Sequence, residues 1–181
     1  MKAAAKFLLA LILSAQAVPF ALATEYPSLL TKKDLGAEND FRGKMAPPLN
    51  VQKWMNKAPD YGDKVVMVDF WATWCGPCCG LIPELNEFQK KFGNDLIIIG
   101  LTNEEPSVVA KFMQQQGFSY SVGIDRKARA EKALGVQSIP HVMIYTPDGR
   151  VRWQGFPGER KEPLNEQVLS RIIAAYKERK K

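Results

Sequence analysis

Apolar and polar positions from Pro47 onward alternate between two kinds of segment. Short apolar runs, rich in β-branched and aromatic residues, predict strands at residues 49–54, 64–71, 95–101, 120–124, 141–145 and 151–155. Longer stretches, whose apolar residues lie three or four positions apart, predict helices at residues 75–92, 107–116, 127–134 and 164–180. Gly93, Gly117 and Gly135 stand where the first three helices should end.

The order of these elements predicts an α/β fold with a central mixed sheet and helices on both faces. Residues 95–101 are almost wholly apolar, which is typical of a central parallel strand covered on both sides. No internal repeat or low-complexity tract interrupts the pattern, so residues 47–181 are expected to form one domain.

The first residues follow a different pattern. Lys2 and Lys6 precede an apolar run, and Ala21-Leu22-Ala23 has the small residues of a cleavage site, so residues 1–23 are predicted to be a secretory signal peptide. The apolar run is short for a membrane span of about 20 residues. Residues 24–46 are polar and without a sustained period, which indicates a loosely packed arm before the domain.

The net charge of the chain and its distribution bear on which partners the protein could bind. Loss of the leader would lower the formal net charge from +6 to +4, and much of the remainder lies in the last few residues, where lysine and arginine suit the negative end of a helix. Basic residues are not interleaved with aromatic ones over a common face, which argues against nucleic-acid binding. The basic end is therefore predicted to be a solvated helix terminus.

All three cysteines lie within the stretch WCGPCCG, residues 74–80. So close a set cannot connect distant parts of a fold, and a disulfide closing so short a loop constrains the unfolded chain little. A zinc site would need more ligands, and His141 is the only histidine. A redox-active pair formed by Cys75 and Cys78 fits best, because the start of a helix stabilises a thiolate and Pro77 is tolerated there.

The same stretch resembles a known family. Residues 68–78 (VDFWATWCGPC), followed by Pro83, resemble the active-site segment of thioredoxins, and Ser138-Ile139-Pro140 resembles their cis-proline loop. The leader, the WATWC sequence and the block from Asn103 to Arg150 are closest to the exported TlpA/ResA-like thiol-disulfide oxidoreductases. The resemblance covers roughly residues 43–155 and implies a thioredoxin-like fold.

This resemblance implies roles for individual residues. Cys75 would attack a substrate disulfide and Cys78 would resolve the mixed disulfide, with Asp69 as the buried acid that moves the proton of Cys78. Glu104 aligns with a glutamate near the cysteines of ResA-like proteins, although an ordinary acid before a helix is the alternative. Many TlpA-like proteins carry Asn in place of Asp69, so the presence of both acids is a departure.

The resemblance also implies a substrate-binding surface. Ile139 would offer its backbone to an extended substrate beside a cis Pro140, and Trp74, Gly76 and Pro77 would complete the contact surface. The other tryptophans, Trp54, Trp71 and Trp153, are predicted to belong to the core or its edges.

Cys79 and His141 leave an alternative open. Cys79 stands where thioredoxin relatives commonly carry a basic residue, and it is interpreted as a bystander thiol because it points about 100° away from Cys78 around the helix. Cys75, Cys78, Cys79 and His141 could instead hold Cu(I), as copper-delivering relatives of the fold do.

The Gly-Pro dipeptide between the cysteines favours a reductant over a disulfide-introducing oxidant. An exported reductant needs electrons delivered across the membrane. The family resemblance implies a membrane thiol-disulfide carrier as the electron donor, and apocytochrome c or other oxidised envelope proteins as clients. We expect a monomer with no metal or other cofactor. An inactive binding module of the same fold is disfavoured by the intact cysteines, Asp69 and Pro140.

Overall fold

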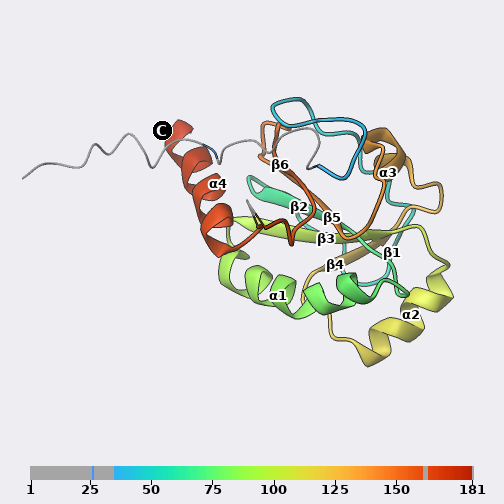
Figure 1. Ribbon diagram of the computed structural model, residues 1–181. Coiled ribbons are helices and arrows are strands. Elements are labelled where there is room, and N and C mark those ends of the chain that lie inside the picture. Colours follow the sequence, from blue (N-terminus) through green and yellow to red (C-terminus); the bar gives the residue numbers. More distant parts are fainter. Residues whose placement is uncertain (1–25, 27–34, 161–162, 181) are drawn as a thin grey trace, which may run out of the picture.

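The structure is a computed structural model of the 181-residue chain and describes Tyr26, residues 35–160 and residues 163–180. Figure 1 shows a sheet with helices on both sides. The strands are β1 (Lys53–Trp54), β2 (Val65–Phe70), β3 (Leu96–Thr102), β4 (Ser121–Ile124), β5 (His141–Tyr145) and β6 (Val151–Gly155). The helices are α1 (Gly76–Phe92), α2 (Pro106–Gln115), α3 (Arg129–Leu134) and α4 (Glu166–Arg179).

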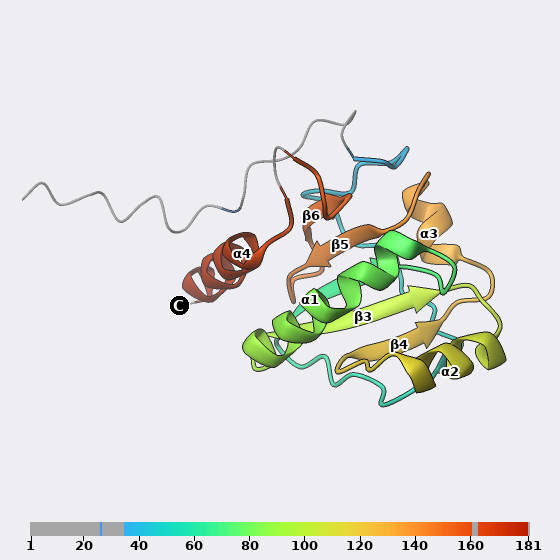
Figure 2. The ribbon, with the colours of Figure 1, turned by 60° about the horizontal axis from the view of Figure 1, so that its bottom comes forward.

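The sheet has the strand order β1-β4-β3-β2-β5-β6. β2, β3 and β4 are parallel to one another, while β1, β5 and β6 run antiparallel to their neighbours. Figure 2 shows α1 lying along one face of the central strands. β2 and β3 are buried over their whole length, because helices or loops cover both faces of the sheet.

Each face of the sheet has its own apolar core. One face packs against α1, α2 and α4 through Leu85, Val109 and Ile172, and Cys75 and Cys78 belong to this core. The other face packs against α3 through Ala130 and Leu134. The predicted α/β fold, with a mixed sheet and helices on both faces, is therefore confirmed.

The element boundaries differ from the predicted ones mainly in β1, which has two residues instead of six. Beyond β1 the side chain of Asn56 replaces the strand ladder: its Oδ1 accepts from Val122 N at 2.8 Å and its Nδ2 donates to Tyr120 O at 2.7 Å. Gly135 ends α3 with a positive φ of 63°, as predicted. Gly117 was the wrong residue for the end of α2, since Gln116 takes the cap position.

Residues 35–46 correct the expectation of a loosely packed arm that lasts until Ala46. Leu35 is fully buried, Ala37 forms a β-bridge with Val136, and Met45 forms one with Arg150. Backbone hydrogen bonds from Glu38 to Gly135 add to this packing. In the described part of the chain the compact unit therefore begins well before Pro47, because the exposed edges of α3 and β6 offer partners that a local sequence pattern does not reveal.

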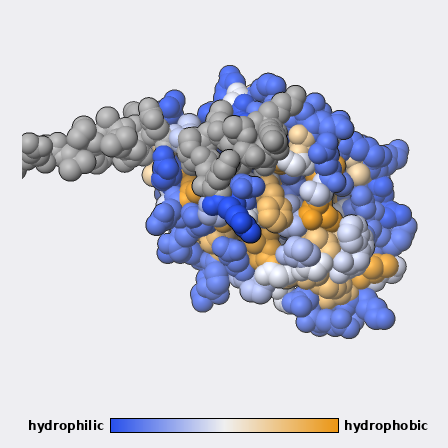
Figure 3. Space-filling model, in the orientation of Figure 1, coloured by the Kyte–Doolittle hydropathy of each residue, from blue (hydrophilic) through white to orange (hydrophobic). Residues whose placement is uncertain are grey.

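The predicted signal peptide, residues 1–23, lies outside the described residues. Among the residues that the structure does describe, no helix is both long and apolar enough to cross a membrane. The face seen in Figure 3 is mostly hydrophilic, with hydrophobic patches in its middle and at its lower right edge. At the basic end of α4, Lys177 pairs with Asp95 at 2.7 Å and Lys180 pairs with Asp63, although both lysines remain more than half exposed.

Candidate active site

Cys75 occupies the N-cap of α1, directly after the loop that follows β2. The backbone N–H of Cys78 donates to Cys75 Sγ at 3.2 Å, so the sulfur takes the place that a Ser or Asp oxygen has in an ordinary cap. Pro77 lies within the first turn, where its missing N–H leaves no intrahelical bond unmade. A Cys75 thiolate would be stabilised by this N–H and by the positive end of the helix.

Cys75 and Cys78 form a disulfide, so the structure is that of the oxidised protein. Cys78 is fully buried, and Cys75 is 5% exposed. Of the two sulfurs, that of Cys75 is therefore the one that a substrate can approach. Gly76 and Pro77, between the two cysteines, are exposed.

The loop before β5 lies against the disulfide. The peptide bond between Ile139 and Pro140 is cis, as the sequence predicted. The carbonyl oxygen of Ile139 is 3.7 Å from Cys75 Sγ; because the sulfur carries no proton in the disulfide, this is a contact and not a hydrogen bond. Trp74 and Ile139 border a hollow of about 340 Å³. The side chain of Trp74 is 75% exposed.

Asp69 lies on β2, beneath the helix that carries the cysteines. Its side chain is 1% exposed, and among the described residues its Oδ1 has no hydrogen-bond partner. Burial raises the pKa of Asp69 from 3.8 to about 7. A carboxyl with such a pKa is able to exchange protons near neutral pH.

Glu104 lies on the loop between β3 and α2 and binds the backbone just before the cysteines. Its Oε2 accepts from Thr73 N at 2.6 Å and its Oε1 accepts from Thr73 Oγ1 at 2.7 Å. Thr102 Oγ1 donates to the same carboxylate at 3.3 Å. The structure thus brings Glu104 to the active-site loop, where it contacts Thr73 and not the sulfurs.

Comparison with known proteins agrees with this geometry. Residues 42–154 match the AhpC/TSA family. The chain belongs to the AhpC/TSA family. Within the curated proteins, a thiol-disulfide oxidoreductase ResA from Bacillus cereus is 30% identical over 175 residues, covering 92% of this chain and 94% of that protein. A thioredoxin from Borreliella burgdorferi is 28% identical over 113 residues, covering 62% of this chain and 75% of that protein.

Solved structures that are similar to this chain also include thiol-disulfide exchange proteins and thioredoxin-like proteins. A putative thiol:disulfide interchange protein DsbE from Chlorobium tepidum aligns with a TM-score of 0.62 and 25% identity, covering 75% of this chain and 97% of that one. A thioredoxin-like protein in its oxidised form aligns with a TM-score of 0.63 at 19% identity, covering 76% of this chain and 98% of that one, and supports the fold alone. This member of the AhpC/TSA family is a thiol-disulfide oxidoreductase of the ResA/DsbE type, and its disulfide joins Cys75 and Cys78.

Cys79 is the free cysteine of this oxidoreductase. Its thiol points back at the loop and donates to Thr73 O at 3.6 Å. Burial raises the pKa of the Cys79 thiol, and the negative charge of Glu104 raises it further. A thiol that stays protonated is a poor nucleophile, which favours the bystander interpretation.

His141 is fully buried on the other face of the sheet, where its ring lies 6.1 Å from that of Phe70. Burial lowers the pKa of His141 to about 4. The four residues of the copper alternative do not assemble: two form the disulfide, and no group of three or more potential ligands occurs among the described residues.

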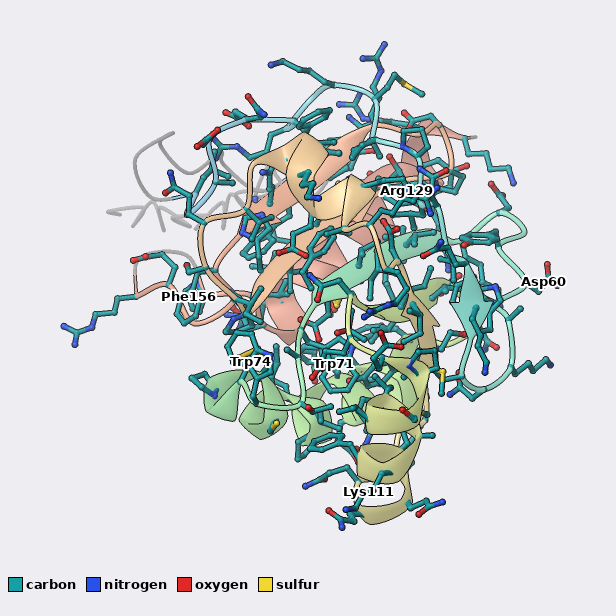
Figure 4. The ribbon with its side chains drawn as sticks, turned by 90° about the vertical axis from the view of Figure 1, so that its right-hand side faces the viewer. Asp60, Trp71, Trp74, Lys111, Arg129 and Phe156 are labelled. Atoms are coloured by element: carbon teal, nitrogen blue, oxygen red, sulfur yellow. A yellow bond between two sulfur atoms is a disulfide. The ribbon has the colours of Figure 1, made fainter. Side chains whose placement is uncertain are left out.

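The sequence analysis missed Phe156, which is 38% exposed. The antiparallel register pairs Val142 with Gly155, so Phe156 follows beside His141 and therefore beside the cis-proline loop. Figure 4 shows Phe156 on the same side of the molecule as Trp74. The available signal was an aromatic residue in the turn sequence GFPG, residues 155–158, where the pattern was interpreted only as the end of a strand.

Replacing Asp69 by Asn should stabilise the oxidised protein at high pH. The unfolded chain ionises this carboxyl near pH 3.8, while the folded chain ionises it near pH 7, so the wild type loses stability as the pH rises through that range. We expect Asp69→Asn to raise the free energy of unfolding by up to about 4 kcal/mol at pH 8 and by little at pH 4. Urea unfolding of the oxidised proteins at both pH values measures the difference.

Asp60→Asn is the control for this prediction, since Asp60 is exposed and its replacement should change stability by less than about 0.5 kcal/mol. An advantage of Asp69→Asn that stays the same from pH 4 to pH 8 would contradict the assignment of a raised pKa.

Proposed function

We propose that the protein is an exported reductase that breaks wrongly formed disulfides in proteins of the cell envelope. The observation that carries this proposal is the sulfur of Cys75 at the N-terminus of α1, beside the Ile139 carbonyl. Cys75 and Cys78 enclose Gly-Pro, the dipeptide of the reducing thioredoxins, whose potential near −270 mV lies well below that of the strongly oxidising periplasmic proteins at about −120 mV.

The reaction begins with the reduced protein. The Cys75 thiolate attacks one sulfur of the client disulfide, which forms a Cys75–client disulfide and releases the second client sulfur as a thiolate that takes up a proton. The N–H of Cys78 and the dipole of α1 stabilise the attacking thiolate. In this way Cys75 becomes the nucleophile without a separate base.

The second step needs the proton of Cys78. The Asp69 carboxylate accepts that proton, and the Cys78 thiolate attacks Cys75 Sγ, which closes the Cys75–Cys78 disulfide and breaks the Cys75–client bond. The client sulfur that was bound to Cys75 leaves as a thiolate and takes up a proton. Two electrons pass from the protein dithiol to the client disulfide. Burial of Asp69 supports this role, because a carboxyl with a pKa of about 7 holds a proton loosely at neutral pH.

Glu104 acts as a positioning residue in this proposal. Its two short hydrogen bonds to Thr73 hold the loop that precedes Cys75. The same charge raises the pKa of Cys79, so Glu104 also disfavours thiolate formation at the wrong cysteine.

The client lies across the loops around Cys75. An extended client segment pairs with the Ile139 backbone, in the manner of an added strand, and places its sulfur over Cys75. Trp74, on one side, and Phe156, near the cis-proline loop, supply apolar surface for the client residues that flank the disulfide. Gly76 and Pro77 complete the surface and leave room for the approaching chain.

Export follows from the leader at residues 1–23, and the reductase then needs electrons from outside the cytoplasm. A membrane thiol-disulfide carrier that reduces the Cys75–Cys78 disulfide supplies them, and apocytochrome c is among the clients. The similarity to a thiol-disulfide oxidoreductase ResA and to a thiol:disulfide interchange protein DsbE supports disulfide exchange as the reaction in this proposal.

Cysteine replacements test the proposed reaction. In the reduction of insulin by dithiothreitol, wild-type protein should accelerate precipitation, and Cys75→Ser should fall to the uncatalysed rate because the nucleophile is lost. Cys79→Ser, the matched control on the same turn, should keep at least about half of the activity, because its thiol is protonated. Equal rates for Cys75→Ser and wild type would contradict a catalytic role, and a collapse in Cys79→Ser would contradict the bystander assignment.

Phe156→Ser tests the client surface. We expect it to lower kcat/KM for an insulin-like protein disulfide about fivefold, corresponding to about 1 kcal/mol of lost apolar contact, and to leave the rate with a small aromatic disulfide reagent unchanged. Val108→Ser, which removes an apolar residue of α2 that is 46% exposed, is the control and should change neither rate. If Phe156→Ser slows both substrates alike, Phe156 serves the active-site structure and not client binding.

A further inference from the structure

Two buried rings, those of Trp71 and Tyr120, lie against a single glycine that is paired with Asp69 beneath the active site. Gly100 on β3 is the register partner of Asp69 on β2, and adjacent strands lie only about 4.8 Å apart. A Cβ atom at Gly100 would lie 3.0 Å from Trp71 Nε1 and 3.2 Å from Tyr120 Cε2. The polar edge of the indole and the phenol ring therefore occupy the space that a side chain at residue 100 would fill.

The polar groups of Asp69, Trp71 and Tyr120 are shielded from solvent. Asp69, Trp71 and Tyr120 are at most 4% exposed, and within the described part of the chain Asp69 Oδ1, Trp71 Nε1 and Tyr120 Oη have no hydrogen-bond partner. Trp71 directly follows β2, and its side chain packs in the same core as Val65 and Met67. Asp69 lies two residues beyond Met67 in this strand and therefore points to the same face. One acceptor and two donors are thus confined together.

The two rings are held firmly in this place. Trp71 packs on Phe118 at a centroid distance of 5.3 Å and on Phe112 of α2 at 5.6 Å. Tyr120 packs edge-on against Phe118 at 5.2 Å, and its backbone oxygen accepts from the Asn56 side chain. Neither ring can turn its polar atom to solvent without breaking these contacts, as the interior position of Trp71 in Figure 4 illustrates.

We infer that Tyr120, together with the indole N–H of Trp71, solvates the Asp69 carboxylate in the space over Gly100, which makes Tyr120 a positioning residue for proton transfer by Asp69. When Asp69 loses its proton, the indole N–H and the phenol hydroxyl donate to its charge, directly or through one bridging water molecule. This inference rests on the proposed role of Asp69 as the base that accepts the proton of Cys78.

Few other charged or titratable groups face the Asp69 carboxyl. Its strand neighbours, Gly100 on β3 and Val142 on β5, carry no charge. α1 contributes Cys78, which is in the disulfide, and Cys79, whose raised pKa keeps it neutral. The negative charge of Asp69 raises the pKa of Tyr120, after the larger effect of burial, which places the phenol within electrostatic reach of the carboxyl.

Tyr120→Phe tests the inference, because it removes one hydroxyl and keeps the ring. In the oxidised protein, the ¹³Cγ chemical shift of Asp69 is followed against pH. Loss of a donor to the ionised form should move the midpoint upward by about one pH unit, a tenfold change in the ionisation constant. A midpoint within about 0.2 units of wild type would overturn the inference.

Two further variants distinguish the loss of the Tyr120 hydroxyl from a structural disturbance caused by the substitution. Tyr145→Phe removes a half-buried hydroxyl from β5 on the opposite face and should leave the midpoint unchanged; an equal shift in this control would overturn the inference. Gly100→Ala places a methyl group against both rings and should raise the midpoint in the same direction as Tyr120→Phe, whereas a lowered or unchanged midpoint would contradict the shared space.

The titration uses the oxidised protein alone, without client or electron donor. A failure of the proposed reductase function would appear in the insulin assay and leave this midpoint unaffected. In the reduced protein, the pH profile for resolution of a Cys75 mixed disulfide should shift upward by the same amount in Tyr120→Phe, an effect that a merely structural role of the hydroxyl would not produce.

Discussion

The hydrogen bond from Cys78 N–H to Cys75 Sγ is the interaction on which the site depends. It exists because a buried parallel strand, β2, passes through a short loop into a helix whose first turn has free N–H groups. The same turn places Cys78 where it can form a disulfide with Cys75, and it keeps Cys78 out of solvent. Other features support this geometry: Glu104 holds the entering loop through Thr73, and the cis-proline loop lies against the exposed side of the sulfur.

The site is costly for the folded protein. An aspartate in the middle of a buried strand lowers stability wherever the pH favours its ionisation, and the sequence nonetheless places Asp69 beneath the cysteines. Gly100 opposite Asp69 leaves space that a larger residue would close, and the N–H edge of Trp71 and the ring of Tyr120 border that space. Burial brings the pKa of the carboxyl to about 7, and the donors inferred beside Gly100 would favour its ionised form. The balance of these two effects sets when Cys78 can be deprotonated.

The sequence predicted much of this arrangement, because its strongest signals are local. Apolar runs at residues 64–71 and 95–101 predicted the central strands, which the structure has at residues 65–70 and 96–102. The position of Cys75 between a strand and a helix predicted the stabilised sulfur. Features that depend on distant segments were missed or wrong. The burial of Leu35, the position of Phe156 beside the cis-proline loop and the electrostatic effect of Asp69 on Tyr120 all involve residues far apart in the chain. Glu104 falls between these cases: its place near the cysteines was predicted, but its partner Thr73 was not.

The central claim is that this oxidoreductase gives electrons to its clients. Its most direct test is the reduction potential of the Cys75–Cys78 pair, measured by equilibration with glutathione buffers at pH 7 and followed by tryptophan fluorescence, for which the exposed Trp74 beside Cys75 is a suitable reporter. A value near −270 mV, about that of thioredoxin, is the predicted result. A value near −120 mV, about that of the strongly oxidising periplasmic proteins, would contradict the claim and make the protein an oxidant.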